Sequence, residues 1–294
     1  MYDASIARAM PDLPGLSGTR YANNYADNRV DGILTHWRLS PMLKFALYGA
    51  ANDSGLAGEI TTGPDRRRIR EDNDMSAIEV VLRLCGAALA GYLLGSIPFG
   101  VLAGRLFGDR DPRAYGSGKT GATNVLRTLG PGAAAFVVIG DVLKGALAVL
   151  LARLVFFGGH SDPNIQATAE AVAGFCAIMG HNYSIFIGFK GGRGVLTGAG
   201  AMIVMAPFAT LIGFLCAIFP ILITRYVSLG SILGAAGSIV AALILLVTHH
   251  DLLPHFLFIL VGGVMIIVSH RDNIDRLLKG TERKLGQPAQ PATG

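Results

Sequence analysis

Long apolar runs recur along the chain between residues 77 and 269, separated by short polar segments. They cover residues 77–107, 132–157, 167–189, 195–223, 227–248 and 254–269. A helix needs about 20 residues to cross the hydrocarbon core of a bilayer. The pattern therefore predicts an all-α integral membrane protein with several crossings.

The distribution of charge decides how many crossings to expect. Six crossings, one for each run, would place the basic loop 104–127 and the basic tail after residue 270 on opposite sides. This contradicts the tendency of basic segments to stay in the cytoplasm. The fourth run contains Ala206-Pro207, and proline is tolerated in the first turn of a helix but not in its interior. Dividing the run there predicts seven transmembrane helices, two of them short, with the N-terminus outside and the C-terminus and motif loops cytoplasmic.

Residues 1–74 differ from the rest of the chain. They are rich in Asn, Asp, Arg and Gly, and their one mildly apolar stretch, 33–49, is broken by Pro41. We interpret them as a weakly ordered extension; the alternative is that the native chain begins at Met75. The seven-helix domain then covers residues 75–286, and residues 287–294 form a flexible tail.

Composition supports the membrane class and indicates an anionic partner. The chain is 51% hydrophobic and 15% charged, whereas soluble domains carry about 25% charged residues. Residues 1–74 contain 9 Lys and Arg against 10 Asp and Glu, and residues 75–294 contain 16 against 10. The three cysteines lie in apolar runs without CxxC spacing, which argues against a disulfide framework or a zinc site.

One glycine-rich segment precedes the basic loop 104–127, and another lies within it. In residues 95–100, GSIPFG, Pro98 interrupts the helix and frees backbone groups, although a simple kink is the alternative. In residues 116–124, GSGKTGATN, backbone N–H groups can converge on an anion ahead of a helix start. The second segment is not a P-loop, because that motif requires glycine where Arg113 stands. A plain turn is the alternative there.

Further polar residues interrupt the later apolar runs. Residues 180–182 (GHN) and 189–195 (FKGGRGV) combine glycines with two cations, which suits phosphate binding, whereas a merely topogenic loop is the alternative. Residues 269–282 place His270 and Asn273 directly after the last run, where they can contact an anion or cap a helix. Asp141 and Lys144 stand at i, i+3 within a run and can form a functional or a structural ion pair.

Taken in order, these segments resemble the motifs of one family, the bacterial acyl-phosphate:glycerol-3-phosphate acyltransferases. The motifs are GSIPFG (95–100), GSGKTGATNVLRTLG (116–130), DVLKG (141–145), GH (180–181), FKGGRGV (189–195), YVSLGS (226–231) and HRDNI (270–274). The resemblance extends over residues 77–286. Lys119 departs from the family's usual Asn, and Arg193 from its usual Lys. Arginine keeps the charge and adds a bidentate fork.

The resemblance implies a multi-pass enzyme of the bacterial inner membrane whose active site faces the cytoplasm. The implied reaction transfers a fatty acyl group from acyl phosphate to the sn-1 hydroxyl of glycerol 3-phosphate. It gives lysophosphatidic acid and phosphate, an early step of phospholipid synthesis. The implied partners are these substrates and membrane lipid, with no nucleic acid, cofactor or metal. A transporter or channel for an organic phosphate is the competing hypothesis; such proteins are commonly built from two related halves, and no internal repeat is found.

The implied chemistry needs orientation and charge stabilisation rather than a protein nucleophile, because acyl phosphate is already activated. The base is the substrate phosphate itself or, alternatively, His270. Candidate catalytic residues are Ser96, His270 and Asn273. Candidate substrate-binding residues are Arg105, Arg113, Gly116, Ser117, Gly118, Gly121, Asn124, His181, Lys190, Gly191, Gly192, Arg193, Ser228 and Ser231. Ser96, Asn124 and the backbone of 116–121 are expected to hold the acyl phosphate. Arg105 or Arg113, Arg193, Ser228 or Ser231, His270 and Asn273 are expected to hold glycerol 3-phosphate.

Overall fold

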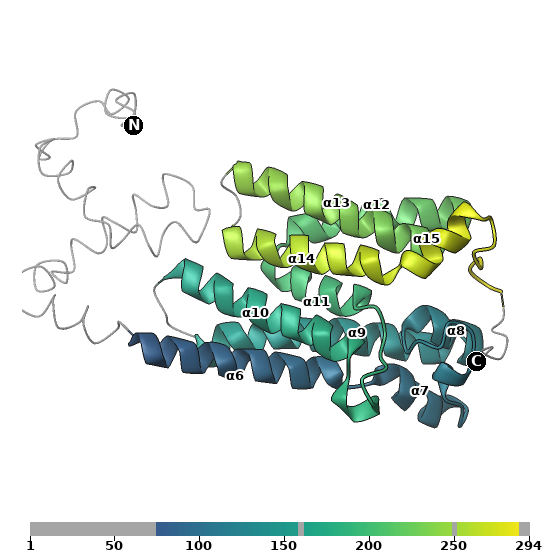
Figure 1. Ribbon diagram of the computed structural model, residues 1–294, viewed down its shortest axis with the longest axis horizontal. Helices are drawn as coiled ribbons and strands as arrows, with labels where there is room; N and C mark the ends of the chain where they lie inside the picture. The colour runs from purple at the N-terminus through teal and green to yellow at the C-terminus, as the bar shows by residue number, and fades with distance from the viewer. Residues whose placement is uncertain (1–74, 158–161, 249–251, 288–294) are drawn as a thin grey trace, which may run out of the picture. The chain divides into compact units, whose positions relative to one another are not determined.

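The computed structural model describes residues 75–157, 162–248 and 252–287, and within these ranges all regular structure is helical (Figure 1). The helices are α6 (Ala77–Ser96), α7 (Phe99–Phe107), η2 (Pro112–Ala114), α8 (Ala122–Leu129), α9 (Pro131–Leu151), η3 (Ala152–Phe156), α10 (Pro163–Asn182), η4 (Ile185–Ile187), α11 (Val195–Met205), α12 (Pro207–Thr224), α13 (Val227–Val247), α14 (Leu253–Ser269) and α15 (Arg271–Leu278). The predicted all-α class is confirmed. The expectations for residues 1–74 and for all but the first residue of the tail lie outside the described residues.

Several of these helices are suited to a bilayer. Within the described ranges, four segments are long and apolar enough to cross a membrane: Ala77–Phe107, Pro131–Phe156, α12 and α13. α14 and α15, which meet at a bend of 54°, provide a fifth when counted together. The chain is therefore an integral membrane protein with four or five candidate crossings, fewer than the seven predicted.

The predicted division of the fourth apolar run is present in the structure. α11 ends at Met205, and α12 begins at Pro207 with the proline in its first turn, where no N–H donor is needed. Met205 and Ala206 are buried in an apolar cluster with Val149 and Ile178. α11 has 11 residues, about half the length required to cross the hydrocarbon core. It therefore ends inside the protein as a partial-depth helix.

α11 lies between two groups of helices (Figure 1). α9 and α10 contact it on one side, with α6 packed against both of them, and α12 and α14 contact it on the other, with α13 packed against both of them. Glycines let α9 and α11 approach closely: a Cβ on Gly145 would collide with the carbonyl of Thr197, and one on Gly200 with that of Val142. Small residues serve the same purpose at many helix interfaces in membranes.

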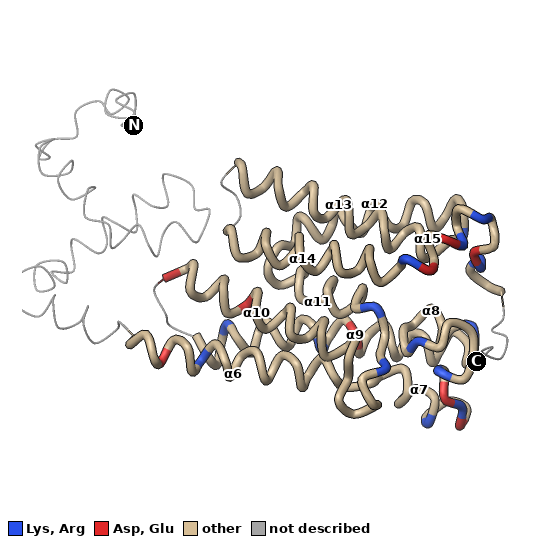
Figure 2. Tube along the Cα trace, viewed as in Figure 1, with Lys and Arg blue, Asp and Glu red and all other residues tan. Residues whose placement is uncertain are grey.

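Charged residues concentrate at one end of the helix bundle, where α7, α8 and α15 lie (Figure 2). The two glycine-rich loops, 108–121 and 188–194, and the segment after α15 are found at this end. The fold therefore brings segments that are far apart in the sequence to one polar face.

Candidate functional site

A cavity of about 480 Å³ opens at the charged end of the bundle and collects residues from six parts of the chain. Of the five polar segments identified in the sequence, four contribute to its wall, and 95–100 does not. The predicted site residues that line it are Gly116, Ser117, Gly121, Asn124, His181, Arg193, Ser228, Ser231, His270 and Asn273. Lys119 and Asp141, both noted in the sequence, line it as well. Residues scattered over more than 150 positions thus form one site.

Cations outnumber carboxylates in the wall of the cavity. The cationic residues are Lys119, Arg127, Arg193, Arg276 and Arg283, and the acidic residues are Asp141, Asp272 and Glu282. Burial lowers the pKa of Arg127, although the nearby Glu282 raises it. Partly desolvated cations attract anions more strongly than cations in bulk water do. The electrostatics of the cavity therefore suit a phosphate-bearing ligand.

The first glycine-rich loop is held in shape by one buried amide. Oδ1 of Asn124 accepts from the Ser117 N–H at 3.0 Å. Its Nδ2 donates to the carbonyls of Pro112 (2.7 Å), Tyr115 (3.1 Å) and Lys119 (2.9 Å). These contacts occupy the polar atoms of the side chain with the loop itself. Asn124 lines the cavity, yet its evident task is to fix the loop's backbone.

The backbone of this loop explains its glycines. Gly116 and Gly118 have φ of 62° and 66°, a left-handed conformation that side chains disfavour. α8 then begins after Gly121, which provides no side-chain cap. Of the first helical turn, the Asn124 N–H donates to the Gly121 carbonyl, whereas those of Ala122 and Thr123 have no partner within their own helix. The turn at Gly121–Thr123 lines the cavity, so an anion there would meet unpaired donors and the positive end of the helix dipole.

The second glycine-rich loop packs against His181. The N–H groups of Gly191 and Gly192 donate to the carbonyls of Asn182 and His181, each at 3.0 Å. A side chain on Gly192 would collide with the imidazole, and one on Gly191 with the His181 carbonyl. The two glycines therefore allow the loop to lie directly on the end of α10. They do not themselves line the cavity.

Arg193 extends from this loop into the cavity. Its Nε donates to the Ser269 carbonyl at 3.1 Å, and no other hydrogen bond of this guanidinium is found in the part of the chain that the structure describes. Burial lowers the pKa of Arg193, and the neighbouring Arg276 lowers it further, whereas Glu282 raises it. One edge of the guanidinium is thus anchored, and the terminal nitrogens are positioned for a ligand.

Glu282 organises the opposite wall. Its Oε1 accepts from the Ser228 hydroxyl at 2.8 Å and from Nδ2 of Asn273 at 2.7 Å, and its Oε2 accepts from Nε of Arg276 at 2.7 Å. Burial would raise the pKa of Glu282, but hydrogen bonds from Asn273, Ser228 and Arg276 outweigh this and lower it. The carboxylate is therefore ionised and joins α13 and α15 to the loop that follows.

His270 lies at the junction of α14 and α15 and is almost completely buried. Its Nδ1 lies 2.8 Å from the Ile266 carbonyl. A carbonyl oxygen can only accept, so Nδ1 carries the proton, and Nε2 is the ring nitrogen left for other contacts. In a neutral imidazole Nε2 has a free lone pair, which makes it able to accept a proton.

A buried charge cluster lies beside the cavity. Asp141 and Lys144 form the predicted ion pair at 2.7 Å, and Nζ of Lys144 also lies 2.9 Å from Nδ1 of His181. The same ammonium donates to the Ile97 carbonyl at 3.0 Å, next to the helix break at Pro98. The GSIPFG motif is thereby connected to the cavity without lining it.

Several predicted residues lie outside the cavity wall. Ser96 is fully buried, and its carbonyl accepts a hydrogen bond from the Ser184 hydroxyl. Arg113 pairs with Asp111 at 2.7 Å and donates to the Ile187 carbonyl at 3.2 Å. The others are Arg105, which is exposed on α7, Gly118, Lys190, Gly191 and Gly192.

Sequence reasoning did not select Arg127, Arg276, Glu282 or Arg283. Arg127 donates to the Arg283 carbonyl at 3.0 Å across 156 positions of the chain. Such a contact has no local signature, because it depends on how α8 and the segment after α15 meet. The only available indication was that these charges adjoin the recognised motifs.

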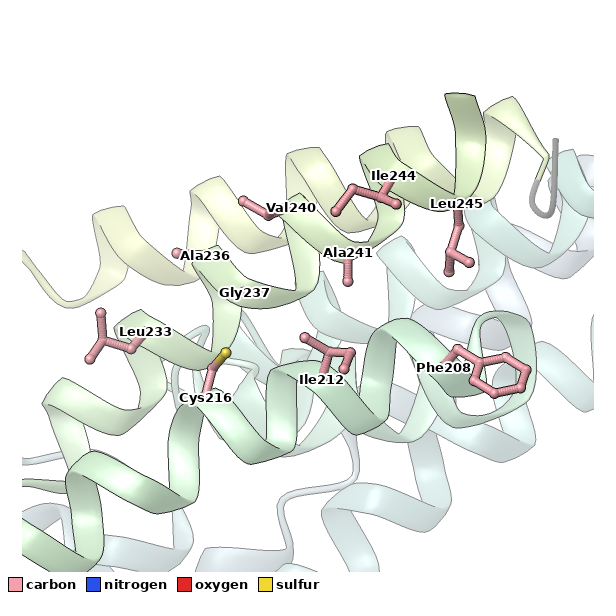
Figure 3. A pocket seen from close by; sticks show the side chains of 10 residues that line it. All are labelled: Phe208, Ile212, Cys216, Leu233, Ala236, Gly237, Val240, Ala241, Ile244 and Leu245. Atoms are coloured by element: carbon pink, nitrogen blue, oxygen red, sulfur yellow. The ribbon is translucent and has the colours of Figure 1, made fainter. Parts of the chain in front are cut away.

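A second hollow lies between α12 and α13, and Figure 3 shows its lining. The side chains there are aliphatic or aromatic, apart from Cys216. It offers no charged group to a phosphate. The polar cavity is therefore the better candidate for chemistry.

Comparisons with known proteins agree with this reading. Residues 85–280 match the family model described as glycerol-3-phosphate acyltransferase. A glycerol-3-phosphate acyltransferase of Synechococcus elongatus is 42% identical over 208 residues, which cover 71% of this chain and 97% of that protein. Another, of Trichormus variabilis, is 44% identical over 216 residues, covering 70% and 94%.

Two crystal structures of PlsY (YgiH), an integral membrane glycerol 3-phosphate acyltransferase, are also similar. Its glycerol 3-phosphate form is 37% identical with a TM-score of 0.60, and the match covers 69% of this chain and 96% of that one. Its lysophosphatidic acid form is 36% identical with a TM-score of 0.59, and the match covers 69% and 95%.

Proposed function

The chain belongs to the glycerol-3-phosphate acyltransferase family, and we propose that it transfers a fatty acyl group from acyl phosphate to the sn-1 hydroxyl of glycerol 3-phosphate. The products are 1-acylglycerol 3-phosphate and phosphate. The observation that carries the proposal is the single cavity in which two glycine-rich loops and five cations meet His270. Both substrates bear phosphate, so a site with two anion-binding elements suits them.

We assign the acyl phosphate to the first glycine-rich loop and the start of α8. The unpaired N–H groups at Gly121–Thr123 favour an anion there. Asn124 supports this loop through its four hydrogen bonds rather than by contact with the ligand. Ser96 and Arg113, which lie outside the wall, are likewise assigned to the support of neighbouring loops.

We assign glycerol 3-phosphate to the side of the cavity lined by Arg193, Ser231 and His270. The free edge of Arg193 can pair with phosphate oxygens, a charge-assisted contact. Crystals of the PlsY relative hold glycerol 3-phosphate in one form and lysophosphatidic acid in the other. A substrate and a product of the proposed reaction therefore both bind a protein of this family.

The proposed reaction is a direct displacement. The substrate hydroxyl oxygen attacks the acyl carbon, and a new ester C–O bond forms as the bond from that carbon to the phosphate oxygen breaks. The proton passes to the substrate phosphate or to Nε2 of His270, and phosphate leaves. The cations of the cavity stabilise the charge that develops on the leaving group.

We further propose seven transmembrane helices, two of them short, with the N-terminus outside and the cavity facing the cytoplasm of the inner membrane. α10 and the partial-depth α11 complete the count. The gathering of Lys and Arg at the cavity end supports this orientation (Figure 2). The acyltransferase domain then covers residues 75–286. A fluorescent reporter that matures only in the cytoplasm, fused after Gly294, should be bright; a dark fusion of a folded, active protein would reverse the orientation.

Purified full-length protein in detergent tests the reaction. With acyl phosphate and glycerol 3-phosphate it should release phosphate and lysophosphatidic acid, and NMR of the product should place the acyl group at sn-1. Turnover with acyl-CoA instead would overturn the proposed donor. Absence of transfer from either donor would overturn the activity, and a transporter would give that result.

A further inference from the structure

A second charge cluster, built around the buried carboxylate of Glu170, lies away from the cavity and is not used by the proposed reaction. Arg153, in the π-helix η3, holds Glu170 of α10 in two contacts, from Nε at 2.7 Å and from Nη2 at 2.9 Å. Glu170 is 2% exposed. Its carboxylate also meets Nε2 of His255 at 3.1 Å and accepts from Nε2 of Gln166 at 3.2 Å. The cluster joins η3, α10 and α14.

Arg153 makes one more contact, and it reaches a fourth helix. Its Nη2 donates to the Val204 carbonyl at 3.2 Å, one residue before α11 ends. The neighbouring Met205 and Ala206 belong to the apolar core. The last carbonyls of a helix lack partners within it, and an apolar interior provides no water to replace them. A cation at this position satisfies a carbonyl and complements the negative end of the helix dipole.

The other end of α11 forms part of the cavity. Val195 and Leu196, in its first turn, line the cavity directly after Arg193 and Gly194. α11 has 11 residues, so about 16 Å separates its two ends. A short helix transmits a displacement of one end to the other. The position of Arg193 in the cavity therefore depends on how the interior end of α11 is held.

α9 and its continuation η3 extend from the cavity, where α11 begins, to the interior end of α11. Asp141 of α9 lines the cavity, and Arg153 of η3 reaches the interior end of α11. Between them, Gly145 and Gly200 bring α9 and α11 into close backbone contact. The close contact restricts sideways movement of α11, and the Arg153 hydrogen bond opposes movement along its axis.

We propose that Arg153 is a positioning residue for the acyltransferase site, which caps the interior end of α11 and so holds Arg193 in place to bind the phosphate of glycerol 3-phosphate. The expected change in kinetics rests on the proposed function, whereas the expected loosening of α11 does not. Glu170 is the counter-ion that allows an arginine to occupy this position. His255 and Gln166 in turn hold the carboxylate.

A simpler role would be that Arg153 only neutralises Glu170. The double variant Arg153→Met/Glu170→Gln separates the two roles. It removes both charges. The amide oxygen can still accept from Gln166, and the amide nitrogen can donate to Nε2 of His255 in the tautomer that leaves this nitrogen unprotonated. Val204, however, loses its charged donor. Neutralisation alone predicts that this variant regains both stability and normal kinetics. Capping predicts that it regains stability while the site stays impaired.

Arg83→Met is the matched control. Arg83 pairs with Glu79 at 2.6 Å and donates to the Phe156 carbonyl at 2.8 Å, so it makes the same two kinds of contact. Its side chain is 38% exposed, against 32% for Arg153. Its carbonyl partner, Phe156, is the last residue of η3 and does not belong to α11. The control variant should leave the kinetics and the behaviour of α11 unchanged.

The experiment combines thermal unfolding, kinetics per folded molecule and hydrogen exchange of full-length protein in detergent. In the double variant, the catalytic efficiency with glycerol 3-phosphate should fall at least about tenfold, since misplacement by about 1 Å can cost about 100-fold. The Michaelis constant for glycerol 3-phosphate should rise more than that for acyl phosphate, because Arg193 is assigned to the former. Amide exchange in α11 should accelerate while that in α13 stays unchanged. Arg153→Lys, which keeps a charged donor, should give an intermediate result.

Normal kinetics and normal α11 exchange in every folded Arg153 variant would overturn the proposal. The single variant Arg153→Met leaves Glu170 without its guanidinium, so loss of folding in that variant alone agrees with either role. The double variant and Arg153→Lys therefore distinguish capping of α11 from neutralisation of Glu170. If the wild-type protein shows no acyl transfer, the proposed function fails, and the exchange of α11 still tests the cap.

Discussion

The Ser228 hydroxyl donates to Oε1 of Glu282 at 2.8 Å and joins the first turn of α13 to the segment that follows α15. Asn273 and Arg276 donate to the same carboxylate. One side chain thus fixes three residues of the cavity wall. Because the Ser228 proton is directed to Glu282, its oxygen lone pairs are available to accept from a substrate hydroxyl.

Glu282→Gln should weaken both the fold and the site. The amide cannot accept from both Asn273 and Ser228 and also pair with Arg276, so hydrogen bonds to a charged group are lost, at about 1.5–3 kcal/mol. Turnover per folded molecule should fall at least about tenfold. Thermal unfolding in detergent and the acyl-transfer assay measure the two effects.

Asp275→Asn is the control for Glu282→Gln. Asp275 pairs with Lys279 at 2.8 Å on the surface of α15, with both side chains more than half exposed. Exposed pairs contribute about 0.2–1 kcal/mol, so this variant should behave nearly as wild type. Equal losses in the two variants would mean that Glu282 has no special structural role.

The lowered pKa of Glu282 predicts how stability depends on pH. A carboxyl group whose pKa is lower in the folded state stabilises the fold while it is ionised. Its contribution to the stability of the fold is complete above pH 4.5, the ordinary pKa of glutamate. It is lost as the pH falls through the lower pKa that Glu282 has in the folded state. The difference in unfolding temperature between wild type and Glu282→Gln should therefore shrink below about pH 4.5. A difference that grows on acidification would contradict the assignment.

Local features could be predicted from the sequence, and long-range contacts could not. The helix break before Pro207 and the Asp141–Lys144 pair depend on neighbouring residues, and both are present. Glu282 acts through Ser228, 54 positions away, and nothing in the local pattern indicates that contact. The same holds for Asn124. The motif singles it out, but the sequence does not show that its amide forms hydrogen bonds to residues 112–119 of the preceding loop.

Asn124→Asp should disturb the first glycine-rich loop. The carboxylate cannot donate to the carbonyls that Nδ2 contacts, and it would face them with negative charge. Each lost buried hydrogen bond costs about 1–3 kcal/mol, so the Michaelis constant for acyl phosphate should rise at least about tenfold. Steady-state kinetics in both substrates measure this.

Thr128→Ala is the control for Asn124→Asp. Thr128 also lies on α8, and its hydroxyl donates only to the Asn124 carbonyl one turn earlier, at 2.8 Å. That variant should stay within about twofold of wild type, a fraction of a kcal/mol. An active Asn124→Asp enzyme with normal Michaelis constants would exclude the role in holding the loop.

Removal of residues 1–74 should leave an active enzyme. The motifs and the cavity lie within residues 95–283, and the family model matches residues 85–280. The chain Met75–Gly294 should therefore restore phospholipid synthesis in a bacterial strain that lacks this acyltransferase. Full-length protein expressed at the same level is the reference. A truncated chain that inserts into the membrane yet gives no transfer would show that the extension contributes to the site.

Arg193 tests the assignment of glycerol 3-phosphate. Loss of a charge-assisted bond in a partly desolvated site costs about 1.5–3 kcal/mol, or roughly 10–150-fold in catalytic efficiency. Arg193→Ala should therefore raise the Michaelis constant for glycerol 3-phosphate more than that for acyl phosphate. Arg193→Lys keeps the charge and should retain most activity.

The opposing interpretation is that Arg193 only adds to the positive charge of a cytoplasmic loop. Arg271→Ala is the matched control, because Arg271 is a cation at the same end of the bundle whose side chain is 83% exposed. If charge alone matters, both alanine variants should insert slightly less well and turn over normally per folded molecule. Because Arg193 lines the cavity and its guanidinium is anchored to Ser269, we expect the kinetic defect in Arg193→Ala alone. An unchanged Michaelis constant for glycerol 3-phosphate would exclude phosphate binding by Arg193.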